Sequence, residues 1–300
     1  FDSPTVLASR SFNSGSGEWS ALNTAFFSID TAPADASNLV ISEIHYRPED
    51  PSDPLELAVS SDRDDYEFIE LENIGGQTLD LSGLRFSAGI DYTFPPQSLL
   101  EIGGRVILVR DAEAFAVRYP GVTPAGEFGG RLSNDGELLQ LVDADGAVLR
   151  RFTYNDQLPW PTAPDGDGLS LVLVAPRSNP DHTQASSWRP SVTAGGSPGE
   201  SDAMAFSGDP GSLLAYALGT SEGAPVAGFI EIEGQSYPAF TIERNHAADD
   251  AVVAVEYSTD LVRWRTDAIL EAAPHGQETW RTPAGRSDRL YWRVQVSLRE

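Results

Sequence analysis

The chain has 300 residues, a formal net charge of −25 at pH 7 and no cysteine. This acidity argues against nucleic acid as a partner, because a negative surface repels phosphate groups. The lack of cysteine excludes disulfides, thiol catalysis and zinc–thiolate sites. No apolar run reaches the roughly 20 residues of a transmembrane helix, so no membrane-spanning segment is expected.

Residues 1–37 are expected to be the end of an upstream β module followed by a linker. Residues 9–12 with 17–20, and then 25–29, are predicted to form two final strands joined by a Gly/Ser turn. Because two strands do not make a stable domain alone, we expect the chain to be a fragment of a longer protein. The linker is predicted at residues 31–37.

Residues 38–94 have the pattern that opens an all-β sandwich. Three β-type runs, at 38–46, 65–73 and 79–86, are separated by an acidic loop and a Gly-Gly turn. The acidic loop, residues 49–65, is longer than a simple hairpin connection, which leaves its conformation open.

The same domain is expected to continue to residue 200. Its further predicted elements are a strand at 105–109, a helix over 112–119, a hairpin of 137–142 and 147–154, and a strand at 169–174. Asp111 is a suitable N-cap for the helix. The Gly- and Pro-rich residues 194–200 mark the predicted domain boundary.

Residues 201–300 are predicted to form a second, smaller β-sandwich domain. It begins with a short amphipathic helix over 212–219, which ends at a glycine. The predicted strands are 228–233, 238–244, 252–258, 277–281 and 290–296.

Several short motifs between residues 38 and 200 occur in a characteristic order. They are Ile41-Ser42-Glu43-Ile44, residues 66–73, Asp80-Leu81-Ser82-Gly83, residues 132–137, residues 168–171, Trp188 and Ser197-Pro198-Gly199. Together they resemble a lamin tail domain of the bacterial secreted type. The resemblance implies an immunoglobulin-like β-sandwich.

Two weaker resemblances flank this domain. Residues 237–240 with 256–264 resemble a C-terminal β-domain common in secreted proteins of Verrucomicrobia and their relatives. Residues 1–30 resemble the end of the fibronectin-III-like modules that accompany chitobiase-type enzymes. These resemblances imply an extracellular or cell-surface location.

Glutamates on the first strands are the candidates for acid–base chemistry. Glu70 and Glu72 lie on one face of a strand, about 7 Å apart by strand rise. Two carboxylates at that separation could serve glycoside hydrolysis, but a flat sheet face provides no desolvation to raise one pKa. We therefore interpret these two, together with Glu43 and Glu67, as a solvent-exposed acidic face.

A G-x-S-x-G motif and the four histidines are also features found in active sites, but we interpret both as structural. Residues 195–199 match G-x-S-x-G but lack the strand before and the helix after that a nucleophile elbow needs, so a turn is predicted. The four histidines are too far apart in sequence for metal-ligand spacing. His45 is expected to be half-buried and hydrogen-bonded.

Calcium is the one cofactor considered. The loop Asp165-Gly166-Asp167-Gly168 is rich in oxygen ligands, although hard cations need six to eight oxygens, usually from several loops. The alternative interpretation is an ordinary turn. Asp165 and Asp167 are the candidate ligands of a weak calcium site.

Trp160 is the candidate ligand-binding residue. It lies between Pro159 and Pro161 in a predicted loop, where an exposed aromatic ring could stack on a sugar. The alternative is that its amphipathic ring covers the edge of a core.

The hypothesis for the whole chain is a non-catalytic structural or interaction module of a large secreted or cell-surface bacterial protein. Adhesion, spacing or anchoring would be its role, with other domains of the same protein, a cell-surface polysaccharide or a protein as partners. The alternative is a carbohydrate- or calcium-binding accessory module of an exoenzyme. An enzyme is not expected, because no convergent set of catalytic residues is present.

Overall fold

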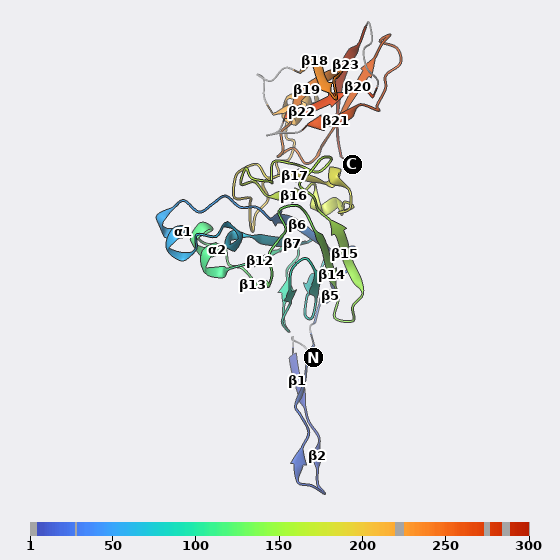
Figure 1. The fold of residues 1–300 in the computed structure, drawn as a ribbon. Coiled ribbons are helices and arrows are strands. Elements are labelled where there is room, and N and C mark those ends of the chain that lie inside the picture. Colours follow the sequence, from blue (N-terminus) through green and yellow to red (C-terminus); the bar gives the residue numbers. More distant parts are fainter. Residues whose placement is uncertain (1–4, 28, 220–224, 273–276, 284–288, 300) are drawn as a thin grey trace.

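The computed structural model describes residues 5–27, 29–219, 225–272, 277–283 and 289–299. Strands dominate it, and they form a projecting hairpin, a large sandwich and a smaller sandwich (Figure 1). The prediction of an all-β fold is confirmed. None of the helices in these ranges is long and apolar enough to cross a membrane.

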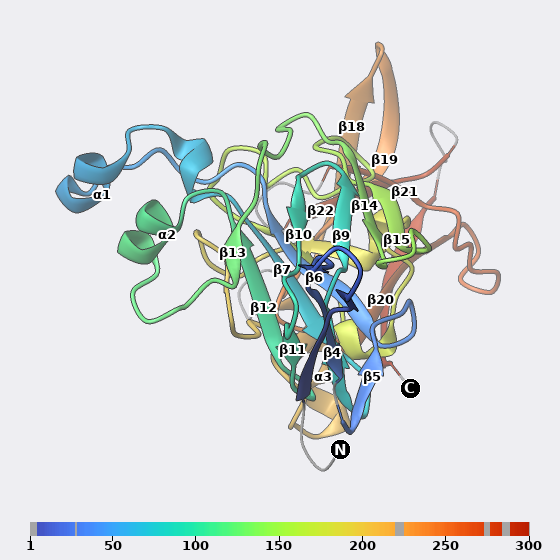
Figure 2. The ribbon, with the colours of Figure 1, turned by 90° about the horizontal axis from the view of Figure 1, so that it is seen from below.

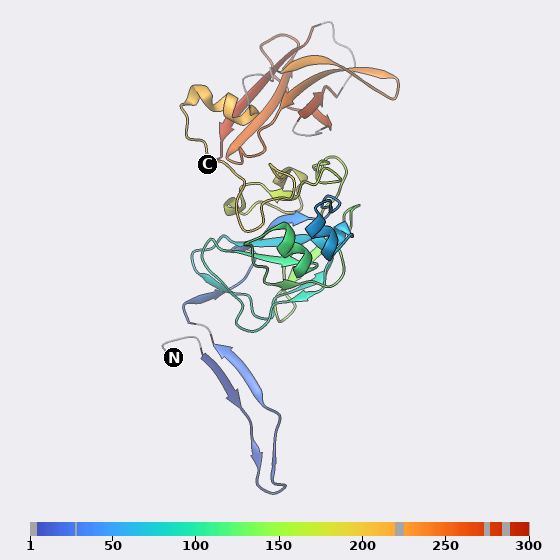
Figure 3. The same ribbon diagram turned by 90° about the vertical axis from the view of Figure 1, so that its left-hand side faces the viewer.

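The N-terminal strands form a hairpin that projects away from the large sandwich, on the side opposite the small one (Figures 1 and 3). Strand β1 (Thr5–Ser9) pairs antiparallel with β4 (Asn23–Phe27), and β2 (Phe12–Asn13) pairs with β3 (Glu18–Trp19). The two predicted strands and their Gly/Ser turn are therefore present as one long hairpin.

The first layer of the large sandwich is a six-stranded sheet. Its order is β13 (Gly126–Glu127), β12 (Arg105–Val109), β7 (Phe68–Asn73), β6 (Leu39–His45), β16 (Leu171–Leu173) and β17 (Trp188–Pro190). Every residue of the central strands β6 and β7 is buried. Burial on both faces means that this sheet has a cover on its outer side as well as a core on its inner side.

Two smaller sheets form the opposite layer. One contains β10 (Tyr92–Thr93), β9 (Arg85–Ala88), β14 (Leu138–Val142) and β15 (Val148–Thr153). The other contains β11 (Leu99–Leu100), β8 (Thr78–Asp80) and β5 (Thr31–Pro33). Side chains of both layers, such as Ile69, Leu71 and Leu141, fill the core between them.

Two local predictions in this domain are wrong. Residues 79–86 form two strands, β8 and β9, instead of one. The Asp80 side chain accepts a hydrogen bond from the Ser82 N–H at 2.9 Å, and Gly83 has φ +79°, so the chain turns between the two strands. Thr31–Pro33, predicted as linker, is strand β5 and pairs in parallel with β8.

The acidic loop contains helical structure that its sequence did not predict. Helix α1 (Pro54–Val59) and a 3₁₀ turn (Arg63–Tyr66) lie within it. The predicted helix α2 (Ala112–Arg118) is present and is capped by Asp111, as expected. Arg118 donates from Nε to Glu56 at 2.6 Å and holds the two helices together. Figure 2 shows both helices on the side of the sandwich away from β14 and β15.

Within the described residues, the small sandwich combines helix α3 (Leu213–Leu218) with six strands. A four-stranded sheet has the order β18 (Val226–Ile232), β19 (Gln235–Glu243), β22 (Gln277–Arg281) and β21 (Ile269–Ala272). The second sheet pairs β20 (Ala251–Ser258) with β23 (Tyr291–Leu298). The rings of Phe240 and Trp292 stack between the sheets, with centroids 5.4 Å apart. Only β21 among these strands was not predicted.

Candidate functional site

The four glutamates expected on a solvent-exposed face are buried. The exposed fractions are 1% for Glu43, 0% for Glu67, 0% for Glu70 and 3% for Glu72. The strand alternation itself was predicted correctly, because Ile69 and Leu71 lie in the sandwich core while Glu70 and Glu72 point outward. For Glu43 and Glu70, the prediction of solvent exposure is wrong because another part of the chain, residues 191–200, covers the outer face of β6 and β7.

This cover, which we call the closing segment, is attached to the glutamates by hydrogen bonds. Ser197 donates to Glu43 twice, from its backbone N–H at 2.9 Å and from its hydroxyl at 3.0 Å. The N–H of Gly199 donates to Glu70 at 2.6 Å. From β16's side, the Ser170 hydroxyl donates to Glu43 at 2.5 Å. The closing segment is a turn, as predicted, and its serine hydroxyl is used in this structural contact.

Arg105 completes the set from strand β12. Its Nη1 donates to Glu70 and its Nη2 donates to Glu72, both at 2.7 Å. A register shift in the pairing of β6 with β7 sets both Ser42 and Glu43 opposite Glu70, and the Ser42 hydroxyl donates to Glu70 at 2.7 Å. These ion pairs and hydrogen bonds stabilise the sheet, and Glu72 and Arg105 also line an open cleft of about 340 Å³.

Burial changes the acidity of this cluster. It raises the pKa of the Glu43 carboxyl well above the usual range, and the neighbouring Glu70 carboxyl adds to the effect. Burial also raises the pKa of Glu70, which the positive charge of Arg105 opposes. Glu67 immediately precedes β7 and, by strand alternation, lies on the other face, with Ile69 and Leu71. It accepts from the Leu132 N–H at 2.8 Å, and burial raises its pKa to about 9. On this outer face, burial therefore favours the protonated forms of Glu43 and Glu70.

His45 and His182 are structural, and His275 lies outside the described residues. His45 is fully buried and, among the described residues, neither ring nitrogen has a hydrogen-bond partner, so the prediction of a half-buried, hydrogen-bonded ring is wrong. Burial lowers its pKa to about 3. His182 accepts from the Ile41 N–H at 3.2 Å. Within the described ranges, no group of three or more His, Asp or Glu side chains is arranged to hold a metal ion.

The loop of residues 165–168 lies against the segment that follows β6. Asp165 forms an ion pair with Arg47, whose side chain is about one-third exposed. That pairing uses one of the two carboxylates considered as calcium ligands. A weak calcium site at Asp165 and Asp167 stays an untested hypothesis.

Trp160 lies at the edge of the large sandwich, next to the small one. Its ring is only 9% exposed and packs near Trp188, with centroids 6.2 Å apart. Most of the ring therefore covers the core, which was the alternative interpretation. Its remaining surface lines a cleft of about 460 Å³ between the two sandwiches.

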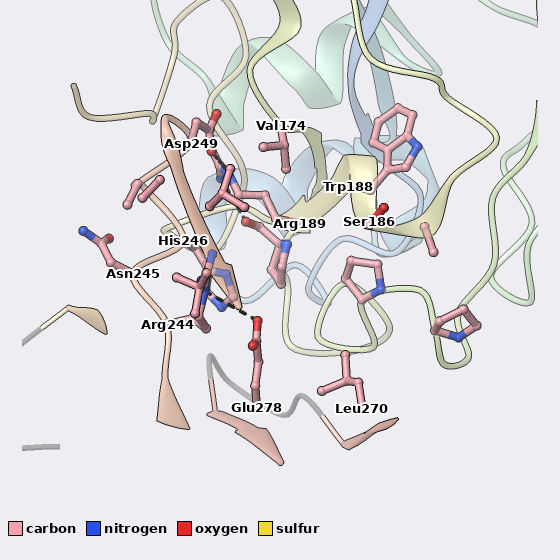
Figure 4. A pocket seen from close by; sticks show the side chains of 18 of the residues that line it. Val174, Ser186, Trp188, Arg189, Arg244, Asn245, His246, Asp249, Leu270 and Glu278 are labelled. Atoms are coloured by element: carbon pink, nitrogen blue, oxygen red, sulfur yellow. Dashed lines mark hydrogen bonds and ion pairs between the residues drawn. The ribbon is translucent and has the colours of Figure 1, made fainter. Parts of the chain in front are cut away.

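We call this space the junction cleft (Figure 4). One wall comes from the large sandwich, chiefly residues 158–161 and 185–190. The other comes from the small sandwich, chiefly residues 244–253, Leu270 and residues 278–280. Each sandwich thus supplies one wall of the cleft. From the sequence, Trp160 was considered only in its own loop, and the small sandwich was not predicted to face it.

Polar groups converge on the small-sandwich wall. Arg244 approaches Glu278 with 3.5 Å between Nε and Oε1, and the indole N–H of Trp280 donates to the other oxygen of Glu278 at 3.1 Å. Burial raises the pKa of Glu278, while the Arg244 charge opposes this. Burial lowers the pKa of His246 to about 4, so its imidazole is neutral at pH 7.

Arg189 of strand β17 connects the two sandwiches beside this cleft. Its Nε donates to Asp249 of the small sandwich at 2.5 Å. Its Nη2 donates at 2.5 Å to Asp202, which lies in residues 201–209, the connecting segment that precedes helix α3. Asp249 also accepts from the backbone N–H of Ala175 at 3.2 Å. Arg189 and Asp249 are 6% and 7% exposed, so this is a buried ion-pair network. We call it the Arg189 network.

Comparison with known families identifies part of the large sandwich. Residues 32–156 match the family model of the Lamin Tail Domain. The chain contains a lamin tail domain. This is a non-catalytic immunoglobulin-like module, and the match confirms the resemblance to a lamin tail domain up to residue 156. The bacterial secreted type and the extension to residue 200 stay predictions. The matched range begins within β5, in the segment that was predicted to be linker.

The comparisons identify nothing beyond this module. No curated protein and no solved structure matches the chain. The resemblances of residues 1–30 and of residues 201–300 to secreted β modules therefore remain predictions. No enzyme family is found, and the lamin tail domain is the one module detected.

Proposed function

We propose that the chain is a non-catalytic spacer and anchoring module of a large secreted or cell-surface protein. In this role, it holds neighbouring domains at a set distance and orientation. The Arg189 network is the observation that carries the proposal, because a spacer needs a rigid connection between its domains.

The connection between the two sandwiches is held by contacts from both of them. A tandem joined only by a flexible linker would leave domain orientation free. Here Arg189 binds an acidic residue of the small sandwich and one of the connecting segment at the same time. That segment also binds the small sandwich, through the Met204 N–H to the Ala247 carbonyl at 2.6 Å and the Phe206 N–H to Asp250 at 2.8 Å. Such repeated attachment supports a fixed geometry.

The N-terminal hairpin supports an interaction role at the other end. Residues 5–27 contain one arginine and one glutamate, so their formal net charge is zero in a chain that carries −25. The hairpin also exposes large apolar side chains: Val6, Leu7, Phe12, Trp19 and Leu22. A two-stranded ribbon with open edges is a template for pairing with another sheet. We propose that a neighbouring β module takes this place.

A substitution at the junction tests the proposal. In Arg189→Leu, the buried Asp249 and the partly buried Asp202 lose their counter-ion, and breaking a buried pair in this way costs about 3–5 kcal/mol. Small-angle scattering should then show a larger radius of gyration, and calorimetry should show the two sandwiches unfolding separately. The matched control is Arg265→Leu, which removes an exposed pair with Asp267 inside the small sandwich.

The outcomes are distinguishable. An unchanged scattering curve for Arg189→Leu would contradict a rigid spacer held by this network. The location is tested separately, by adding protease to intact cells that produce the full-length protein. Cleavage of this module on intact cells is expected, and complete protection would contradict a surface location.

A further inference from the structure

The junction cleft has the size and position of a ligand site. Its volume of about 460 Å³ falls within the range of small-molecule sites, which occur preferentially at domain interfaces. The Arg189 network fixes both walls relative to one another, so the cleft is preformed. This feature is independent of the spacer role.

The walls combine apolar surface with a few polar groups. Trp160, Leu270 and Trp280 supply apolar surface from three separate segments. Figure 4 shows Leu270 on the small-sandwich side. Glu278 offers a carboxylate whose partner Arg244 is 3.5 Å away, beyond normal hydrogen-bond length. A ligand hydroxyl could therefore bond to this carboxylate and to the guanidinium without breaking a strong contact.

The charges exclude two classes of ligand. Three arginines line the cleft, Arg189, Arg244 and Arg299, which disfavours a cation. An anion is disfavoured because the chain carries a net charge of −25 and two of these arginines already face carboxylates, Asp249 and Glu278. His246 is neutral at pH 7 and adds no charge.

A neutral ligand with both hydroxyl groups and apolar C–H faces fits what is left. We propose that the junction cleft binds a neutral saccharide of one or two sugar rings. The hydroxyls bond to Glu278 and Arg244, and the C–H faces lie against Trp160, Leu270 and Trp280.

The test titrates the whole chain with a panel of neutral disaccharides: lactose, maltose, cellobiose and N,N′-diacetylchitobiose. Calorimetry and intrinsic tryptophan fluorescence are the two readouts, since three tryptophans line the cleft. At least one sugar should bind. Glu278→Gln should weaken its binding about tenfold, because a hydrogen bond to a charged group is lost. Leu270→Arg should abolish binding by filling the cleft.

Glu271→Gln is the matched control. Glu271 lies on the neighbouring strand β21 and pairs with Arg281 at 2.5 Å, outside the cleft. This variant should bind as the wild type does. The proposal is overturned if no sugar of the panel binds, or if Glu278→Gln binds with unchanged affinity. It is also overturned if tetramethylammonium or acetate binds and the sugars do not.

Discussion

Ser197 donates two hydrogen bonds to Glu43, one from its backbone N–H and one from its hydroxyl, and the two residues are 154 positions apart in the chain. This contact fastens the closing segment to the outer face of strand β6. It turns an acidic sheet face into an interior layer. The stability of the large sandwich therefore depends on a carboxyl group that resembles a surface residue in the sequence.

Two substitutions of Glu43 should differ strongly in their effect at pH 6. Glu43→Ala leaves the buried Ser170 hydroxyl and two partly buried donors of Ser197 without an acceptor, and we expect a loss of about 3 kcal/mol in the free energy of unfolding. Glu43→Gln keeps an oxygen for the Ser197 N–H and matches a carboxyl that burial already holds protonated, so it should cost less than about 1 kcal/mol. Urea denaturation measures both.

The control for Glu43 is Glu231→Ala, at an exposed position of β18. It should change the free energy of unfolding by no more than about 0.5 kcal/mol. Equal losses for Glu43→Ala and Glu43→Gln would show that the negative charge, and not the hydrogen-bond acceptor, matters at this position.

Glycine substitutions in the closing segment test how closely it approaches the sheet. Gly195 and Gly196 have φ values of +88° and +73°, so alanine meets similar backbone strain of about 1 kcal/mol at either position. A Cβ at Gly196 would overlap the Glu43 carboxyl, whereas one at Gly195 would lie 3.6 Å from the Tyr119 hydroxyl. Gly196→Ala should therefore cost at least about 2 kcal/mol more than Gly195→Ala. Thermal melts of the pair decide this, and equal melting temperatures would refute it.

The sequence predicted most strands but not what covers them. Local alternation in residues 68–73 showed which side chains share a face, and the N-cap Asp111 located helix α2. Whether water reaches the outer face of β6 and β7 depends on residues 191–200, which contact it from more than 120 positions further along the chain. Such a long-range contact has no local signal, and this is why Glu70 and Glu72 were predicted to be exposed.

The same limit applies to the candidate site. Trp160 was selected from its local setting between two prolines, and it does line a cleft. The opposite wall comes from residues such as Glu278 and Trp280, in a domain that sequence periodicity describes only by itself. The helix in the acidic loop was missed for a related reason: Arg118, which binds Glu56, lies 62 residues further on.

Calcium should have little effect on the wild-type protein. Asp165 is already paired with Arg47, and a cation would have to displace that guanidinium to use the carboxylate. We expect melting temperatures with and without millimolar calcium to agree, and Asp165→Asn and Asp167→Asn to behave alike in both conditions. A calcium-dependent rise in the melting temperature that either variant removes would establish the site instead.

Stability should decrease from pH 7 to pH 9. The pKa of Glu67 is raised to about 9 from its ordinary value of 4.5, so its folded-state contribution is complete below about pH 4.5 and is lost as the pH rises through 9. Glu43 acts in the same direction. The buried His45 and His182 have lowered pKa values and act only below about pH 6.5, where stability falls as the pH falls.

Between pH 7 and 9 the carboxyls therefore set the trend. Each can lower the free energy of unfolding by at most about 1.4 kcal/mol per pH unit. Glu67→Gln removes one of these ionisations without changing the shape of the side chain, so its stability should depend less on pH over this range than that of the wild type. Urea midpoints at pH 7, 8 and 9 measure the slope. A wild-type midpoint that stays constant or rises toward pH 9 would show that Glu67 and Glu43 are ionised in the folded protein without cost.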